Sequence, residues 1–181
     1  MVAASNIPFV DDVVPAYLAL TVFFDSHQTT YDAVVEQVIR VCQSPEVGAE
    51  SKRSRMHVIP VEYEGIDLEL VADKTGFSVA EVVARHTART YSVDLLGFVP
   101  GFAYLSELDP ALQLPRRAQP RPRVAAGSVA IAGAQTGVYP LDTPGGWHIL
   151  GRTATSMFDA AREPPALLAP GDSVRFEAVR G

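Results

Sequence analysis

The sequence predicts a protein of the α+β class, and two observations carry this prediction. Near the start, the β-branched and aromatic residues 13–24 are typical of a strand, and residues 31–42 repeat apolar side chains at the three- and four-residue spacing of an amphipathic helix. After Arg89, short β-branched segments alternate with Gly, Pro and Asp. Many short strands with such punctuation favour a barrel or a sandwich.

A polar stretch, residues 43–55, contains Pro45 and Gly48 and separates these two parts of the chain. Polar, proline- and glycine-containing stretches are typical of domain boundaries. We therefore expect an α/β segment over residues 1–55 and a strand-rich domain over residues 56–181.

The second domain opens with one strand and two short helices. Residues 56–63 alternate loosely as a strand, with Pro60 at an edge or a bulge. A helix near residues 67–74 is expected to end at Gly76, a favoured residue for the left-handed position after a helix. The segment 78–81 reads Ser-Val-Ala-Glu, which predicts a capping box at the start of the next helix.

The strands of the second domain are each bounded by Gly, Pro or Asp. They are expected at residues 90–98, 127–133, 136–142, 146–153 and 172–179, with one helical turn at 157–162 and a turn at 170–172.

Composition excludes several classes of function. The formal net charge of −6 argues against nonspecific nucleic-acid binding. Cys42 is the only cysteine, so an intrachain disulfide and a cysteine-based zinc site are impossible, and a reducing cytoplasm fits. The apolar run 17–24 is too short to span a membrane, and no basic region of the kind that opens a secretion signal precedes it.

A proline- and arginine-rich strip, residues 95–123, is the most unusual part of the chain. Its first half is apolar and aromatic and is interrupted by Gly97, Pro100 and Gly101, and its second half carries four arginines among prolines. Stiff, extended backbone with clustered guanidiniums predicts a wall that recognises anions. The alternative is a solvated surface loop.

A second loop, residues 143–147, contains Gly145, Gly146 and Trp147. Adjacent glycines expose backbone N–H groups that can receive an oxyanion, although a tight turn followed by a core indole is the alternative. Gln135, Thr136 and Tyr139, on the preceding hairpin, offer neutral polar groups. His86 falls on the apolar face of its helix, which suits either a buried core histidine or a group that transfers protons.

Standard motifs for nucleotide binding and for serine hydrolases do not occur. The chain has no Gly-x-x-x-x-Gly-Lys-Ser/Thr loop, no G-x-G-x-x-G and no G-x-S-x-G elbow. His57 would lie on the opposite face of its strand from Glu62 and Glu64, so we predict no metal site there.

Three long segments together resemble the allophanate hydrolase subunit 1 family, which includes the B subunit of 5-oxoprolinase and the sporulation-kinase inhibitor KipI. They are HTARTYSVDLLGFVPGFAYL, LPRRAQPRPRVAAGSVAIAGAQTGVYPLDTPGGWHILGRT and LLAPGDSVRF, and the resemblance runs from about Met56 to Glu177. It implies a cyclophilin-like β-barrel over residues 56–181 that follows a ferredoxin-like α/β domain. Only one strand-helix unit is visible in residues 1–55, so we expect that this domain is truncated, that a partner covers its open strand edge, or that the front region is rebuilt.

The resemblance also implies a function: a non-autonomous subunit of an ATP-dependent 5-oxoprolinase, which opens the cyclic amide of 5-oxoproline to glutamate. The implied partner is a second carboxyltransferase-like subunit (allophanate hydrolase subunit 2, or the C subunit of 5-oxoprolinase), with the 5-oxoprolinase A subunit as a further candidate. The assembled complex would use ATP, and this chain would bind no cofactor of its own. The alternative is a KipI-like regulator that binds and inhibits a sensor histidine kinase. Prolyl isomerase activity is a third, weaker idea, because it rests on the fold alone.

Carried onto this sequence, the resemblance implies a set of site residues. Gly145 and Gly146 would receive an oxyanion, the arginines would hold a carboxylate or a phosphorylated intermediate, and His86 would move a proton or orient the first loop. The full set is His86, Pro100, Gly101, Tyr104, Arg116, Arg117, Arg121, Gln135, Gly145, Gly146 and Trp147.

Overall fold

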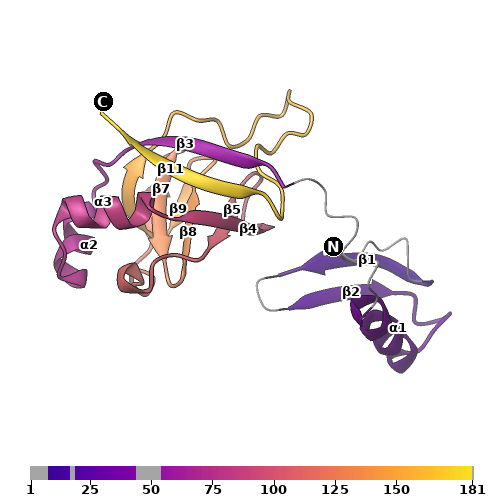
Figure 1. Cartoon of the computed structure of the whole chain (residues 1–181). Helices are drawn as coiled ribbons and strands as arrows, with labels where there is room; N and C mark the ends of the chain where they lie inside the picture. The colour runs from indigo at the N-terminus through magenta and orange to yellow at the C-terminus, as the bar shows by residue number, and fades with distance from the viewer. Residues whose placement is uncertain (1–7, 17–18, 44–53, 181) are drawn as a thin grey trace. The chain divides into compact units, whose positions relative to one another are not determined.

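The structure, a computed structural model, describes residues 8–16, 19–43 and 54–180 of the 181-residue chain (Figure 1). The chain divides into two compact units, residues 1–53 and 54–181. In the parts of both units that the structure describes, no helix is both long and apolar enough to cross a membrane.

The N-terminal unit contains a β-hairpin and one helix. Strands β1 (Val10–Pro15) and β2 (Leu20–Phe24) are antiparallel, and helix α1 (Tyr31–Gln43) follows them. The prediction of a single strand over residues 13–24 is therefore wrong. Proline has no N–H to donate to a strand ladder, and the chain turns just beyond Pro15, where the Ala16 amide donates to the Ala19 carbonyl at 2.8 Å. The predicted helix is confirmed, whereas the truncated ferredoxin-like identity stays a prediction.

The second unit is a closed seven-stranded barrel, which confirms the predicted α+β class with a barrel. Around the barrel the strands run β10-β3-β11-β4-β5-β8-β7. Only the β3–β11 pair is parallel. The strand bounds are β3 Met56–Glu62, β4 Thr90–Leu96, β5 Ala103–Ser106, β7 Ser128–Ala132, β8 Gln135–Val138, β10 His148–Arg152 and β11 Ser173–Val179.

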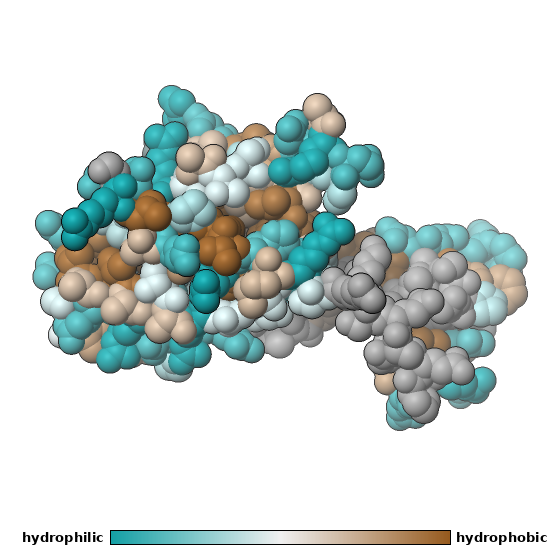
Figure 2. All heavy atoms as spheres, turned by 45° about the horizontal axis from the view of Figure 1, so that its top comes forward, coloured by the Kyte–Doolittle hydropathy of each residue, from teal (hydrophilic) through white to brown (hydrophobic). Residues whose placement is uncertain are grey.

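Alternation along the strands fills the barrel interior. On β3, Ile59 and Val61 are buried while Val58 and Pro60 are exposed, as expected where successive side chains point to opposite faces. Apolar residues also occur on the outer surface of this unit, where Figure 2 shows them in brown among hydrophilic residues. The interior cluster contains twenty buried residues, so this core is the main source of the unit's stability.

Helices α2 (Leu68–Thr75) and α3 (Val79–Thr87) pack against the barrel, α2 on β10 and α3 on β11. Both predicted helix signals are confirmed. Gly76 ends α2 in the left-handed region with φ of 74°, and Ser78 with Glu81 forms the capping box of α3.

Three strands were not predicted: β5, β6 (Arg121–Val124) and β9 (Thr143–Gly145). They are three or four residues long, and β6 and β9 contain proline, so they lack the length and alternation by which strands are recognised in sequence. β6 and β9 form a separate two-stranded sheet. A short 3₁₀ helix, Pro110–Leu112, ends with Leu112, which is buried in the core cluster.

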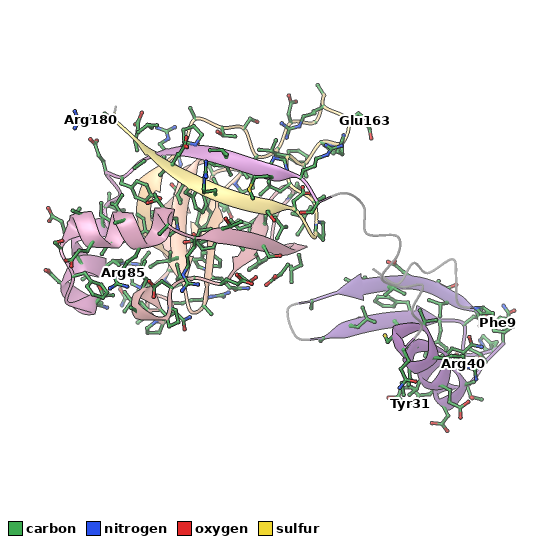
Figure 3. All side chains as sticks on the ribbon, in the orientation of Figure 1. Phe9, Tyr31, Arg40, Arg85, Glu163 and Arg180 are labelled. Carbon is green, nitrogen blue, oxygen red and sulfur yellow. The ribbon has the colours of Figure 1, made fainter. Side chains whose placement is uncertain are left out.

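The helical turn predicted at residues 157–162 is wrong. Phe158 instead forms an isolated bridge with Ala166, and the Arg162 guanidinium donates to the Pro165 carbonyl at 2.8 Å, which ties the segment back on itself. This long connection between β10 and β11 projects from the barrel, with Glu163 near its tip (Figure 3).

Candidate functional site

A pocket of about 220 Å³ opens where the arginine-rich strip meets the double-glycine loop. It lies over a second, smaller apolar cluster, separate from the barrel interior. Aromatic rings, guanidiniums and glycine backbone line it together, a mixture typical of a site for a small ligand with one charged group. The lining residues are Phe98, Phe102, Tyr104, Arg116, Arg117, Pro120, Tyr139, Pro144, Gly145, Gly146 and Trp147.

Four aromatic side chains form the apolar wall of the pocket. Phe102 contacts Tyr104, Tyr139 and Trp147 edge-to-face, with ring centroids 5.0–5.4 Å apart. Phe102, Tyr139 and Trp147 are buried. Edge-to-face packing fixes the orientation of each ring, so this wall is rigid before any ligand binds.

Backbone pairing brings the proline- and arginine-rich strip and the double-glycine loop together. In the β6–β9 sheet Arg121 lies opposite Gly145, and the Arg117 amide donates to the Gly146 carbonyl at 2.8 Å. A Cβ on Gly145 would lie 2.3 Å from the Tyr139 hydroxyl, whereas one on Gly146 would meet nothing closer than 3.7 Å. Gly145 is therefore required by packing, and Gly146 is not.

Asp67 forms ion pairs with two of the arginines and leaves the cluster with a net positive charge. This residue directly precedes α2 and is 2% exposed. Its Oδ1 accepts from Arg121 Nη2 at 2.7 Å and from Arg117 Nη1 at 3.1 Å, while its Oδ2 accepts from the Ile149 amide at 2.8 Å. In the sequence the arginines form a run without an acid, and this carboxylate, 50 residues away from Arg117, supplies the missing charge.

The same contacts keep Asp67 ionised. Burial by itself raises the pKa of this carboxyl, but the hydrogen bonds from Arg121 and Ile149, with the charges of Arg121 and Arg117, outweigh it and lower the pKa below its usual value. Asp67 is thus a buried carboxylate whose nearest charged groups are two guanidinium cations.

Arg116 and Arg123 differ from this pair. The Arg116 guanidinium is exposed at the pocket, with its Cζ 6.0 Å from the centroid of the Trp147 ring, at the outer limit of a cation–π contact. Arg123 forms an exposed ion pair with Asp142 and does not line the pocket. Arg116 is therefore the arginine best placed to meet a ligand from solvent.

His86 lies in the barrel core and not in the pocket. It is fully buried and stacks on Phe176 with ring centroids 4.7 Å apart. Thr136 Oγ1 donates to the Ala130 carbonyl, so it accepts from Nε2–H of His86 at 2.8 Å, and Nδ1 then accepts from the Tyr63 hydroxyl at 2.6 Å. Burial lowers the pKa of His86 to about 3, so the ring is neutral at neutral pH. The buried core histidine, one of the two alternatives for this residue, is what the geometry favours.

Four other residues of the predicted set also lie outside the pocket lining: Arg121, which is held behind it by Asp67, and Pro100, Gly101 and Gln135. Pro100 is exposed, and Gly101, with φ of 80°, packs so closely that a Cβ would lie 2.6 Å from the Phe158 Cβ. Both belong to the β4–β5 turn, residues 97–102, which places the pocket residues Phe98 and Phe102. Gln135 opens β8 and is half-buried.

The site contains residues that sequence reasoning missed, chiefly Asp67 and Phe98, whereas Tyr139 was expected only as a neutral polar group of the preceding hairpin. Phe98 is 59% exposed and has φ of 72°, a backbone conformation that costs energy for a residue other than glycine. The cluster Gly97-Phe98-Val99-Pro100-Gly101 is visible in sequence as an irregular turn, but nothing in it indicates which ring faces a pocket.

A larger but more open depression of about 500 Å³ lies over α3. Its main charges pair with each other: Arg85 contacts Asp109 at 3.0 Å and lies over the Phe77 ring at 4.1 Å (Figure 3 labels Arg85). In the described part of the chain no three His, Cys, Asp or Glu side chains gather as a metal site would require, and His57 instead contacts Asp172 at 3.1 Å. The pocket beside the arginines is therefore our candidate site.

Comparison with known proteins adds a family. A family model described as carboxyltransferase domain, subdomain C and D, matches residues 1–168. The B subunit of 5-oxoprolinase from Escherichia coli O157:H7 is 45% identical over 174 residues, which is 94% of this chain and 79% of that protein. The corresponding 5-oxoprolinase B subunit of Bacillus subtilis strain 168 is 39% identical over 181 residues, which is 93% of this chain and 75% of that protein.

A solved structure agrees with the fold. The crystal structure of TTHA0988 matches with a TM-score of 0.81 and 43% identity, and the match covers 96% of this chain. It covers 34% of the TTHA0988 chain, so this protein spans about a third of that longer chain.

Proposed function

Because the chain belongs to the family of carboxyltransferase domains, subdomains C and D, we propose that it is a non-autonomous subunit of an ATP-dependent 5-oxoprolinase. In this reaction the ring C–N bond of 5-oxoproline breaks. Water supplies a hydroxyl to the carbonyl carbon and a hydrogen to the nitrogen, which yields glutamate. ATP hydrolysis drives the step in the assembled complex, and the complex works in the cytoplasm.

The observation that carries the proposal is the composition of the pocket. 5-Oxoproline is a small ring with one carboxylate, and the pocket combines a rigid aromatic wall with the guanidiniums of Arg116 and Arg117. The pocket volume of about 220 Å³ lies below the roughly 300–1,000 Å³ of drug-sized sites, as suits a small metabolite. The ring packs against Tyr104 and Trp147, and the carboxylate meets Arg116 in a charge-assisted hydrogen bond.

The glycine loop has the second role in the proposal. Cleavage of an amide develops negative charge on the carbonyl oxygen, which backbone N–H groups stabilise when they are oriented in advance. Gly145 and Gly146 line the pocket and are held by the β6–β9 sheet and by the Arg117 amide. We assign them the oxyanion, and we assign His86 a structural role because it is buried outside the pocket.

This chain is proposed to supply one part of the catalytic site. Its partners are a second carboxyltransferase-like subunit, of the type of the 5-oxoprolinase C subunit, and the 5-oxoprolinase A subunit. No standard nucleotide-binding loop occurs in the sequence, so ATP is used by the complex and this chain binds no cofactor of its own. The isolated chain is expected to show no turnover.

Reconstitution tests the proposal. The chain is mixed with the products of neighbouring genes for the two partner proteins, and glutamate release from 5-oxoproline is measured with and without ATP. Release is expected only when ATP and every component are present. Arg116→Ala should lower the rate and Arg123→Ala should not, because Arg123 lies outside the pocket. Absence of release with all components folded would contradict the proposal.

One observation favours the second candidate, a KipI-like regulator that binds and inhibits a sensor histidine kinase. Phe98 is an exposed aromatic residue in a strained conformation, a type of residue often found at the centre of protein interfaces. Calorimetric titration of a kinase dimerisation domain would decide this alternative, which predicts binding that Phe98→Ala weakens. The role in 5-oxoprolinase remains our preferred proposal because the Escherichia coli and Bacillus subtilis relatives are named for it.

A further inference from the structure

We propose that Asp67 is a positioning residue that sets the affinity of the pocket for anions: it retains Arg121 and releases Arg117 to an anionic guest. The inference rests on the proposed function in one respect, since it requires that the pocket admit a small anion. It goes beyond that function because it assigns opposite roles to two arginines that look alike in the sequence.

One oxygen of Asp67 accepts hydrogen bonds from two guanidiniums. Arg121 Nη2 lies 2.7 Å from Oδ1 and Arg117 Nη1 lies 3.1 Å from the same atom, while Oδ2 is taken by the Ile149 amide. A single oxygen that accepts from two cations holds the more distant one less firmly. Arg117 is therefore the weaker of the two contacts.

Arg117 can gain contacts with a ligand in the pocket. It lines the pocket, whereas Arg121 does not, and its side chain is 28% exposed against 19% for Arg121. Its Nε is buried without a hydrogen-bond partner, as is Nη1 of Arg121. A buried unpaired donor is costly, so a rearrangement in which Arg117 exchanges Asp67 for an acceptor that its Nε can also reach is favoured.

The release of Arg117 from Asp67 costs little free energy. After Arg117 leaves, Asp67 still accepts from Arg121 and from the Ile149 amide, so the buried carboxylate keeps a charged partner. The Arg117 backbone is anchored by its amide bond to the Gly146 carbonyl. Only the side chain has to move, and one carboxylate replaces another as its partner.

This exchange predicts that Arg121 affects binding without touching the ligand. If Arg121 is removed, Asp67 has Arg117 as its sole cation and holds it, because a buried carboxylate without a partner is strongly destabilising. The pocket then loses one of its guanidiniums. If Asp67 is also neutralised, Arg117 is free again.

The test measures binding of 5-oxoproline to the full chain by calorimetry and by the fluorescence of Trp147, the only tryptophan and a pocket residue. Arg121→Met should weaken binding by about fivefold or more, the lower end of typical coupling between sites. Arg121→Lys, which keeps the charge but cannot form the same fork, should fall between the wild type and Arg121→Met. The double variant Asp67→Asn/Arg121→Met should bind at least as tightly as the wild type.

Arg123→Met is the matched control, because Arg123 lies on the same strand, β6, and pairs with Asp142 outside the pocket. Its binding should equal that of the wild type. A purely structural role for Arg121 predicts that the double variant binds more weakly than Arg121→Met, and that result would overturn the proposal. So would wild-type affinity in Arg121→Met. Should Arg121→Met fail to fold, Arg121→Lys decides the same question with a smaller effect.

A second probe separates this inference from the proposed function. If the wild type binds inorganic phosphate but not 5-oxoproline, the proposed substrate is wrong, and the same series of variants is measured with phosphate. If neither anion binds, the exchange is wrong as well. If both anions bind but the affinities of the variants follow a different order from the one predicted above, only the proposed exchange of Arg117 between Asp67 and the ligand is wrong.

Discussion

Of two buried ionisable groups in the barrel unit, one is charged and the other is neutral, although both are almost completely shielded from water. Asp67, beside the pocket, is 2% exposed, and His86, in the core, is 0% exposed. Asp67 is surrounded by two guanidiniums and an amide and stays charged, whereas His86 is surrounded by two hydroxyls and aromatic rings and stays neutral. Burial alone lowers the pKa of His86 and keeps its ring neutral, whereas at Asp67 the guanidiniums and the amide outweigh the effect of burial and keep the carboxylate charged.

The difference separates a site from a scaffold. A cation that is held by a buried carboxylate can exchange that carboxylate for an anionic ligand, as proposed for Arg117. The neutral ring of His86 already has hydrogen bonds at both nitrogens and has no donor or acceptor left for a ligand. Four changes test this contrast, from the largest expected effect to the smallest.

Removal of the Asp67 carboxylate should have the largest effect. Asp67→Ala leaves two partly buried guanidiniums without their partner, and breaking a buried ion pair typically costs about 3–5 kcal/mol. Urea denaturation should show this loss in the free energy of unfolding. Asp142→Ala, which removes an exposed ion pair with Arg123 and an exposed hydrogen bond from the Ala126 amide, should lower the free energy of unfolding by much less than Asp67→Ala. Equal losses for both variants would contradict the special status of Asp67.

Acid should affect the two groups in different pH windows. The pKa of His86 is about 3 in the folded protein and about 6.5 in the unfolded chain, so the unfolded chain binds the extra proton. Stability should fall as pH falls below about 6.5, by about 1.4 kcal/mol per unit once the unfolded form is protonated. Asp67, whose pKa is lowered, adds its loss only below the ordinary pKa of aspartate. Denaturant melts at pH 7, 5.5 and 4.5 would check this, and His86→Gln should flatten the dependence in that range.

Gly145→Ala should disturb the pocket more than Gly146→Ala. The added Cβ at position 145 would lie 2.3 Å from the Tyr139 hydroxyl, and overpacking of this kind costs about 1–3 kcal/mol. Gly146→Ala has room for its methyl group. Thermal melts of the two variants should therefore differ by several degrees. If Gly146→Ala were the less stable variant, the packing argument for Gly145 would be wrong.

Arg116→Ala should leave stability almost unchanged, within about 0.5 kcal/mol, because the side chain is exposed. It should weaken 5-oxoproline binding by about tenfold, since a hydrogen bond to a charged group is worth about 1.5–3 kcal/mol. Arg121→Ala, by contrast, should lower the melting temperature because of the ion pair with Asp67. The two arginines look alike in the sequence, and the structure separates them because only Arg121 pairs with the buried Asp67.

Much of the second unit could be predicted because its signals are local. The capping box of Ser78 and Glu81, the left-handed Gly76 and the strands after Arg89 depend on neighbours within a few residues. The hairpin β1–β2 and the strands β6 and β9 could not be predicted in the same way, because short strands with proline show little alternation.

The candidate site was predicted in part. Tyr104, Arg116, Arg117, Gly145, Gly146 and Trp147 are brought to one pocket, and Arg121 lies directly behind it, opposite Gly145. His86, Pro100, Gly101 and Gln135 are not in the pocket lining. Helical spacing placed His86 on an apolar face, but spacing alone could not tell whether that face lines a cavity or a core.

The sequence by itself determined the α+β class, a second domain of many short strands, and the two segments rich in arginine and in glycine, since each depends on residues close together in the chain. The choice of a barrel over a sandwich came from the family resemblance and is confirmed by the structure. Only the tertiary structure decided which arginines are already paired. Asp67 reaches Arg117, Arg121 and Ile149 across 50, 54 and 82 residues. Contacts of such separation form only when the barrel closes, and they leave no regular spacing in the sequence by which they could be recognised.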